Sequence, residues 1–136
     1  MTDVLVVVDQ TLVRDMVAEV LRDAGLRVTE ADSAEAALRA VEAAPEPPDV
    51  LVTDVALGPG AMGGRALAAE LRRRAPETCV VYLAERPAAP ADDALDSRER
   101  WLAKPFEPAR LARLVCEMAP PCPKRPRRVR GMDVMR

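Results

Sequence analysis

The sequence contains no histidine, and aromatic residues make up only 2% of its 136 residues. Its three cysteines show no metal-ligand spacing, which, in the absence of histidine, disfavours a zinc site. An odd number of cysteines in an otherwise ordinary chain is typical of a reducing compartment. Because aromatic side chains are so few, the core must be built from valine, leucine, alanine and methionine.

The chain also has no long apolar run and no strong overall charge. No stretch approaches the length needed to span a membrane, and the N-terminus lacks the charged region of a signal peptide. We therefore expect a soluble, cytoplasmic protein with no membrane contact. The formal net charge of -2 disfavours general nucleic-acid binding by the domain as a whole.

Hydrophobic residues make up 49% of the chain, enough to fill the core of a single domain. Short apolar runs alternate with amphipathic stretches along its length. This alternation indicates an α/β fold with a doubly wound, five-stranded parallel sheet. Strands are predicted at residues 4–8, 26–31, 50–54, 79–83 and from 101, and helices from 11, 33, 65 and 108.

Local signals mark the ends of several elements. Asp9 or Thr11 can cap the first helix, and Gly25 is a natural stop for it. Ser33 is positioned to cap the second helix. The proline-rich fourth connection leaves room only for a short or irregular fourth helix, roughly from Asp92 to Arg98.

The last part of the chain differs in composition from the rest. From Pro120 it reads Pro-Pro-Cys-Pro-Lys-Arg-Pro-Arg-Arg-Val-Arg, with too little apolar content to pack and too much proline for regular structure. We therefore expect a folded domain over residues 1–118 and a disordered basic tail over residues 119–136. The simplest interpretation of the tail is a solvating extension, with a polyanion or partner contact as the alternative.

Charged side chains stand at the ends of three predicted strands. The run Val4 to Val8 is followed by Asp9, the run Val50 to Thr53 by Asp54, and the fifth strand by Lys104. Ligands bind at the carboxyl ends of the strands in open α/β sheets, and these side chains meet at that edge. The two acids and the lysine predict a metal and phosphoryl site there.

Taken in order, these segments resemble a response-regulator receiver domain, the phosphoacceptor half of two-component signalling. The resemblance is carried by the two acid-terminated runs, the Gly-Pro-Gly loop at residues 58–60, and Lys104-Pro105-Phe106. It covers the chain from about Thr2 to Met118. It implies the flavodoxin-like strand order 2-1-3-4-5.

The resemblance also implies roles for individual residues. Asp54 matches the phosphoacceptor, and Asp9 matches the direct Mg²⁺ ligand. Ala56 matches the position whose backbone carbonyl coordinates the metal, and Lys104 matches the lysine that binds a phosphoryl oxygen. Trp101 matches the aromatic switch position.

Three positions depart from the family pattern. Receivers usually carry two adjacent acids after the first strand, and here the first is Val8. Loss of such an outer-shell group weakens metal binding or activity by about 10–100-fold. Ala84 replaces the usual Thr or Ser, so a hydrogen bond to the phosphoryl group, worth about 1.5–3 kcal/mol, is missing. From Val8 we expect weakened Mg²⁺ binding, and from Ala84 impaired coupling to Trp101. Glu85 stands where a small residue is usual, and it would either add negative charge beside the phosphate or pair with Lys104 in a resting state.

The sequence therefore predicts a stand-alone, single-domain response regulator. It would accept a phosphoryl group on Asp54 from a histidine kinase or phosphotransfer protein in a phosphorelay, and pass the signal to a downstream protein target or through a homodimer. It would not be an enzyme beyond self-catalysed phosphotransfer. One alternative is a pseudo-receiver that is never phosphorylated and works as a constitutive protein-binding or dimerisation module. Another is a nucleic-acid adaptor that uses Lys124 to Arg130.

Overall fold

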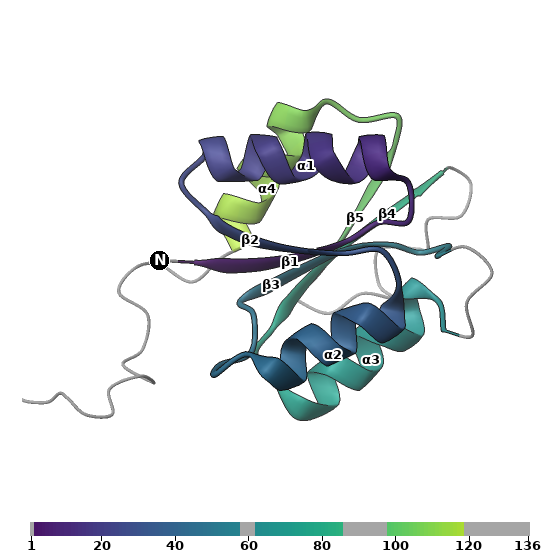
Figure 1. Cartoon of the computed structure of the whole chain (residues 1–136). Coiled ribbons are helices and arrows are strands. Elements are labelled where there is room, and N and C mark those ends of the chain that lie inside the picture. The colour runs from purple at the N-terminus through teal and green to yellow at the C-terminus, as the bar shows by residue number, and fades with distance from the viewer. Residues whose placement is uncertain (1, 58–61, 86–97, 119–136) are drawn as a thin grey trace, which may run out of the picture.

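Five parallel strands form a single sheet between two layers of helices (Figure 1). The computed structural model describes residues 2–57, 62–85 and 98–118 of the chain. The strand order is β2-β1-β3-β4-β5, which confirms the predicted topology. The elements are β1 (Asp3–Val7), α1 (Thr11–Asp23), β2 (Arg27–Ala31), α2 (Ala34–Ala43), β3 (Val50–Asp54), α3 (Gly64–Arg74), β4 (Cys79–Glu85), β5 (Glu99–Lys104) and α4 (Pro108–Met118).

The helices cover both faces of the sheet. Helices α1 and α4 lie on one face, and α2 and α3 lie on the other (Figure 1). Val4, Val6 and Val8 belong to the core beneath α1 and α4, whereas Leu5 and Val7 belong to the core beneath α2 and α3. All five side chains are buried, which is why this segment reads as one unbroken apolar run rather than as an alternating pattern.

Two of the predicted helix signals are confirmed. The Ser33 hydroxyl oxygen accepts a hydrogen bond from the Ala36 N–H at 3.0 Å, as an N-cap residue does. Gly25 follows α1 with a φ of 92°, in the left-handed region that favours glycine. Its N–H donates to the Arg22 carbonyl at 2.9 Å, so it ends the helix as expected.

The start of α1 differs from the prediction. Its N-cap residue is Gln10, so neither Asp9 nor Thr11 caps the helix. The apolar stripe of the helix is also wider than its buried face, because Leu12 is 84% exposed and Met16 is 40% exposed. At about 100° per residue, Leu12 lies about 180° and Met16 about 140° from the buried Leu21, so both are on the solvent side of α1.

Two predictions concern residues outside the ranges that the structure describes. The short fourth helix lies outside the described residues, apart from Arg98, which is in a turn. The basic tail, residues 119–136, lies outside them entirely.

Strand β5 begins at Glu99, two residues earlier than predicted. Within the described ranges, the structure contains no helix with the length and apolar character to cross a membrane.

Candidate functional site

Asp54 and Lys104 meet at the carboxyl edge of the sheet. Asp54 is the last residue of β3, and Lys104 is the last residue of β5. The Lys104 Nζ atom lies 2.7 Å from the Asp54 Oδ1 atom. The Asp54 residue is only 3% exposed, whereas the Lys104 side chain remains 30% exposed. The ion pair therefore has its acid inside the protein and its cation at the opening.

The environment of Asp54 acts on its pKa in opposing directions. Burial is the largest influence and raises the pKa of Asp54 above its ordinary value. Lys104 acts in the opposite direction, and the nearby negative charge of Asp9 raises the pKa further. Asp9 is exposed, two residues beyond the end of β1. A cation added between the two acids would relieve both the desolvation and the repulsion.

The main chain at Asp54 is packed tightly against the start of α3. The Gly64 N–H donates a hydrogen bond to the Val55 carbonyl at 2.9 Å. A Cβ atom at position 64 would overlap the Asp54 carbonyl oxygen and lie 2.9 Å from the Asp54 carbonyl carbon. Only a glycine allows the helix to approach the strand end this closely, so Gly64 fixes the backbone that carries Asp54.

The donor set at this edge suits a hard cation that keeps part of its water shell. Asp9 and Asp54 are two carboxylates, and Ala56 follows Asp54 on an exposed turn. Mg²⁺ is usually bound through one or two carboxylates plus waters rather than by a full protein cage. In the described part of the chain, no group of three or more His, Cys, Asp or Glu side chains could hold a metal ion. The residues present fit Mg²⁺ with few protein ligands.

Val8 contributes nothing to that donor set. Its side chain is fully buried in the core beneath α1 and α4. Its main chain is held on both sides, because its N–H donates to the Ala31 carbonyl at 3.2 Å and its carbonyl accepts from the Arg14 guanidinium at 2.8 Å. The position therefore supports the core and the path of the chain into Asp9.

Ala84 and Trp101 lie on the two neighbouring strands that flank the site. Ala84 is buried near the end of β4 and pairs with Ala103 of β5. It offers a methyl group where a hydroxyl was expected from the family pattern. The side chain of Glu85, the next residue, lies outside the described parts, so the role considered for it stays untested.

Trp101 is held in a stack of three side chains beside α3. Its ring centroid lies 5.3 Å from that of Tyr82, with an interplanar angle of 40°. The Arg65 guanidinium lies 5.3 Å from the Tyr82 centroid and 5.9 Å from the Trp101 centroid, within cation–π range of both. The Tyr82 hydroxyl donates to Glu99 at 3.0 Å, and burial with this neighbour raises the pKa of Tyr82 to about 12. The stack favours a fixed position for the Trp101 ring.

These observations agree with comparisons to known proteins. The profile of the response regulator receiver domain family matches residues 4–115. The chain belongs to this family. Its fold is accordingly that of a flavodoxin-like receiver, and receiver domains act in two-component signalling. Receiver domains generally bind Mg²⁺ at the phosphorylation site and interact with histidine kinases or phosphotransfer proteins and with downstream targets.

Solved structures of other receivers resemble this one over most of its length. The receiver domain of NtrX from Brucella abortus is 32% identical, with 85% of this chain and 95% of that chain covered and a TM-score of 0.72. The chemotaxis response regulator CheY4 of Vibrio cholerae is 28% identical, with 87% and 98% covered and a TM-score of 0.74. Against a longer NtrX chain, the match covers 88% of this receiver and 27% of that chain. No curated protein matches this receiver.

The structure places the predicted site residues in two groups. Asp54 and Lys104 are in direct contact, with Asp9 close enough to influence Asp54. Trp101 and Ala84 lie beside this group on β5 and β4. The functions assigned to these residues remain predictions from the family pattern.

Sequence reasoning missed the roles of Gly64 and Arg65. Four glycines lie in residues 58–64 after β3, and nothing in the sequence showed that Gly64 is the one packed against the Asp54 backbone. Arg65 is the first residue of the predicted helix, where a charged side chain usually faces solvent, and its two aromatic neighbours lie far along the chain. The pairing of Tyr82 with Trp101 in the β4–β5 register was the signal that could have revealed the stack.

Proposed function

We propose that this receiver accepts a phosphoryl group on Asp54 from a histidine kinase or phosphotransfer protein, as one step of a phosphorelay. The observation that carries the proposal is the 2.7 Å ion pair between the buried Asp54 Oδ1 and Lys104 Nζ. In the transfer, an Asp54 carboxylate oxygen forms the new bond to phosphorus as the bond between phosphorus and the donor group breaks. The chain acts as the recipient of the group and at most catalyses its own modification, so it is not an enzyme toward a separate substrate.

Lys104, and Mg²⁺ held by the two acids, would together stabilise the negative charge of the phosphoryl group. In the transition state, negative charge spreads over three equatorial phosphoryl oxygens, and fixed cations stabilise it. Lys104 already lies at the mouth of the site and could turn from Asp54 to an incoming oxygen. Bound Mg²⁺ would neutralise further charge, held by Asp9, Asp54 and the Ala56 carbonyl. Because Val8 supplies no outer-shell acid, we propose that Mg²⁺ binds about 10–100-fold more weakly than with such an acid present.

The start of α1 is where we propose that the donor protein docks. This helix begins two residues after Asp9 and presents Leu12 and Met16, which are spaced by one helical turn and are both exposed. Exposed apolar side chains beside a charged site are suited to contact with a protein partner. We propose that this apolar pair contacts the phosphodonor.

Phosphorylation and the Trp101 ring should be poorly coupled in this receiver. Ala84 has no hydroxyl that could bind a phosphoryl oxygen, which removes about 1.5–3 kcal/mol from the coupling. The Trp101 ring is also held by Tyr82 and Arg65. We therefore propose that output runs through phosphate passed onward or through surface contacts, with a downstream protein or a second copy as partner.

The proposal is tested by incubating the full chain with Mg²⁺ and acetyl phosphate or beryllofluoride. Incorporated phosphate is measured by intact-mass spectrometry, and Trp101 fluorescence is recorded in the same samples. Asp54→Asn is the control for the acceptor. Phosphate on Asp54 with little change in fluorescence is the expected result. A full fluorescence change would overturn the impaired coupling, and no phosphate at all would favour the constitutive binding module.

A further inference from the structure

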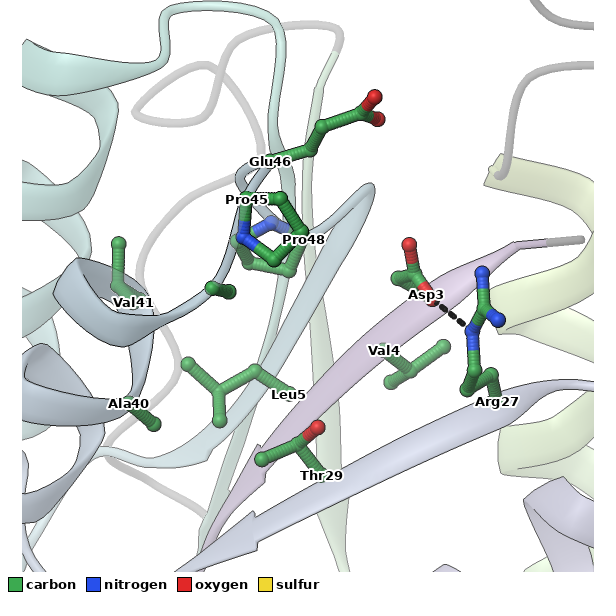
Figure 2. A pocket seen from close by; sticks show the side chains of 11 residues that line it. Asp3, Val4, Leu5, Arg27, Thr29, Ala40, Val41, Pro45, Glu46 and Pro48 are labelled. Carbon is green, nitrogen blue, oxygen red and sulfur yellow. Dashed lines mark hydrogen bonds and ion pairs between the residues drawn. The ribbon is translucent and has the colours of Figure 1, made fainter. Parts of the chain in front are cut away.

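A second concave site lies at the opposite edge of the sheet from Asp54. Its cavity, of about 490 Å³, is bounded by the first residues of β1, the nearby part of β2, the end of α2 and the loop that follows α2 (Figure 2). This volume is within the range of ordinary ligand sites. Figure 2 shows Val41 on one side, the Asp3–Arg27 pair on the other, and Leu5 with Thr29 between them.

The cavity combines an apolar floor with an acidic rim. Leu5 and Val41 contribute to the floor, together with alanines and prolines of the α2 end and its loop. On the rim, Arg27 is bound to Asp3 at 2.6 Å. The hydrogen bond and negative charge of Asp3 are the main reason that the pKa of the exposed Arg27 guanidinium is raised. The charges of Asp49 and Glu46 raise it further. Of the charged residues, Asp3, Glu46 and Arg27 line the cavity and leave a local charge of -1, and the buried Asp49 lies outside the lining.

We propose that the cavity binds the basic segment Lys124–Arg130 of the same chain. Five of these seven residues are Lys or Arg. An arginine side chain has an apolar stem and a cationic head, so it can cover Leu5 and Val41 while its guanidinium reaches the acidic rim. Charge complementarity favours this segment over residues 119–123, which precede it and carry no charge.

The chain is long enough to reach the cavity. Helix α4 ends at Met118, whose carbonyl accepts a hydrogen bond at 3.6 Å from the thiol of Cys79, the first residue of β4. Cys79 pairs with Val50, and Val50 pairs with Val4, which lines the cavity. Two strand spacings amount to about 10 Å. The six residues from Met118 to Lys124 can span about 20 Å, twice that distance.

Covalent attachment favours this occupant over one from solution. Because the segment is attached to the domain, its effective concentration at the cavity is about 1 mM. Even a weak contact, with a dissociation constant of about 0.1 mM, would then keep the segment bound for about nine-tenths of the time. A second copy of the chain would match this only at protein concentrations near 1 mM. The cavity is remote from Asp54, so the docking does not depend on phosphorylation.

Limited trypsin digestion of the full chain tests the proposal. Cleavage within residues 124–130 is followed by mass spectrometry at low salt and compared with a free peptide of residues 119–136. We expect cleavage about tenfold slower in the protein than in the peptide, as follows from nine-tenths occupancy. In about 1 M salt, where screening acts within about 3 Å, the two rates should become equal.

Two variants locate the contact, and a third controls for charge. Glu46→Lys reverses a rim charge, and Thr29→Trp fills the cavity from an exposed position on β2. Both should restore cleavage at the peptide rate. Glu19→Lys makes the same charge change at an exposed position of α1 and should leave protection intact. Circular dichroism confirms that each variant is folded before digestion.

Several results would overturn the proposal. Cleavage of the wild-type chain at the peptide rate would show that the segment is not docked. Protection retained in both Glu46→Lys and Thr29→Trp would place the contact elsewhere. Protection that increases with protein concentration would identify a second copy as the partner, and protection seen only after adding DNA would identify a nucleic acid.

Discussion

Replacing Gly64 with alanine tests how the backbone of the site is built. A Cβ at this position would overlap the Asp54 carbonyl oxygen and lie 3.0 Å from the Val55 Cα. These are main-chain atoms, so no flexible side chain can turn aside. The end of β3 and the start of α3 must therefore move apart. We expect Gly64→Ala to displace the residue that carries the proposed phosphoryl group.

The size of the effect follows from two opposing contributions. Overpacking against a backbone costs about 3 kcal/mol. Alanine has a better helix propensity than glycine, which offsets about 1 kcal/mol of this. The unfolding free energy of Gly64→Ala should therefore fall by about 2 kcal/mol, with a Tm lowered by roughly 6–10 °C for a domain of this size.

Gly63→Ala is the matched control. A Cβ at position 63 would lie 3.3 Å from the Val55 carbonyl oxygen, so a shift of a few tenths of an ångström accommodates it. As an N-cap change it should lower the unfolding free energy by less than about 1 kcal/mol. Urea unfolding followed by circular dichroism gives both values. Equal losses in the two variants, or no loss in Gly64→Ala, would refute the reasoning.

Three further predictions concern the site and its surroundings. Ala84→Thr restores a hydroxyl, so acetyl phosphate should change Trp101 fluorescence more in this variant than in the wild type; identical responses would argue against the coupling defect. Burial raises the pKa of Asp54 above its ordinary value of 3.8, so the folded state holds this proton more tightly and the contribution of Asp54 to stability falls as pH rises above 3.8. Asp54→Asn should therefore gain stability relative to the wild type as pH rises above about 4, and a difference in urea titrations that is constant with pH would contradict this. Leu12→Gln combined with Met16→Gln should change the unfolding free energy by less than about 1 kcal/mol. The same double variant should slow phosphorylation by a protein donor but not by acetyl phosphate, and equal rates with the protein donor would remove the docking role.

The fold could be predicted because its determinants are local patterns that agree with one another. The unbroken apolar run from Val4 to Val8 indicated a strand covered on both faces, and α1, α4, α2 and α3 do cover the sheet. Once the strands were known to be parallel, topology alone brought Asp54 and Lys104 to one edge. Asp54 and Lys104 come into contact at 2.7 Å because of the register of β3, β4 and β5.

The remaining features depend on contacts that sequence spacing does not encode. Gly64 is one of four glycines in residues 58–64, and the approach of α3 to the Asp54 carbonyl distinguishes it. Leu12 is apolar, but nine residues at about 100° each place it roughly opposite the buried Leu21 on α1, and it is 84% exposed. Arg65 faces aromatic rings rather than water because Tyr82 and Trp101 lie side by side on β4 and β5.

The stack around Trp101 bears on what a phosphorylated Asp54 could do. An aromatic pair contributes about 0.5–1.5 kcal/mol beyond its buried area, and an arginine over a ring contributes about 0.5–1 kcal/mol. Moving the Trp101 ring would forfeit both, a loss of about 1–2.5 kcal/mol. Ala84 removes a further contribution of about 1.5–3 kcal/mol. Phosphorylation should therefore favour movement of the ring by about 2.5–5.5 kcal/mol less than in a receiver with the hydroxyl and no such stack. That difference changes a two-state equilibrium by a factor of about 10² to 10³ or more, which is enough to separate accepting a phosphoryl group from moving the ring.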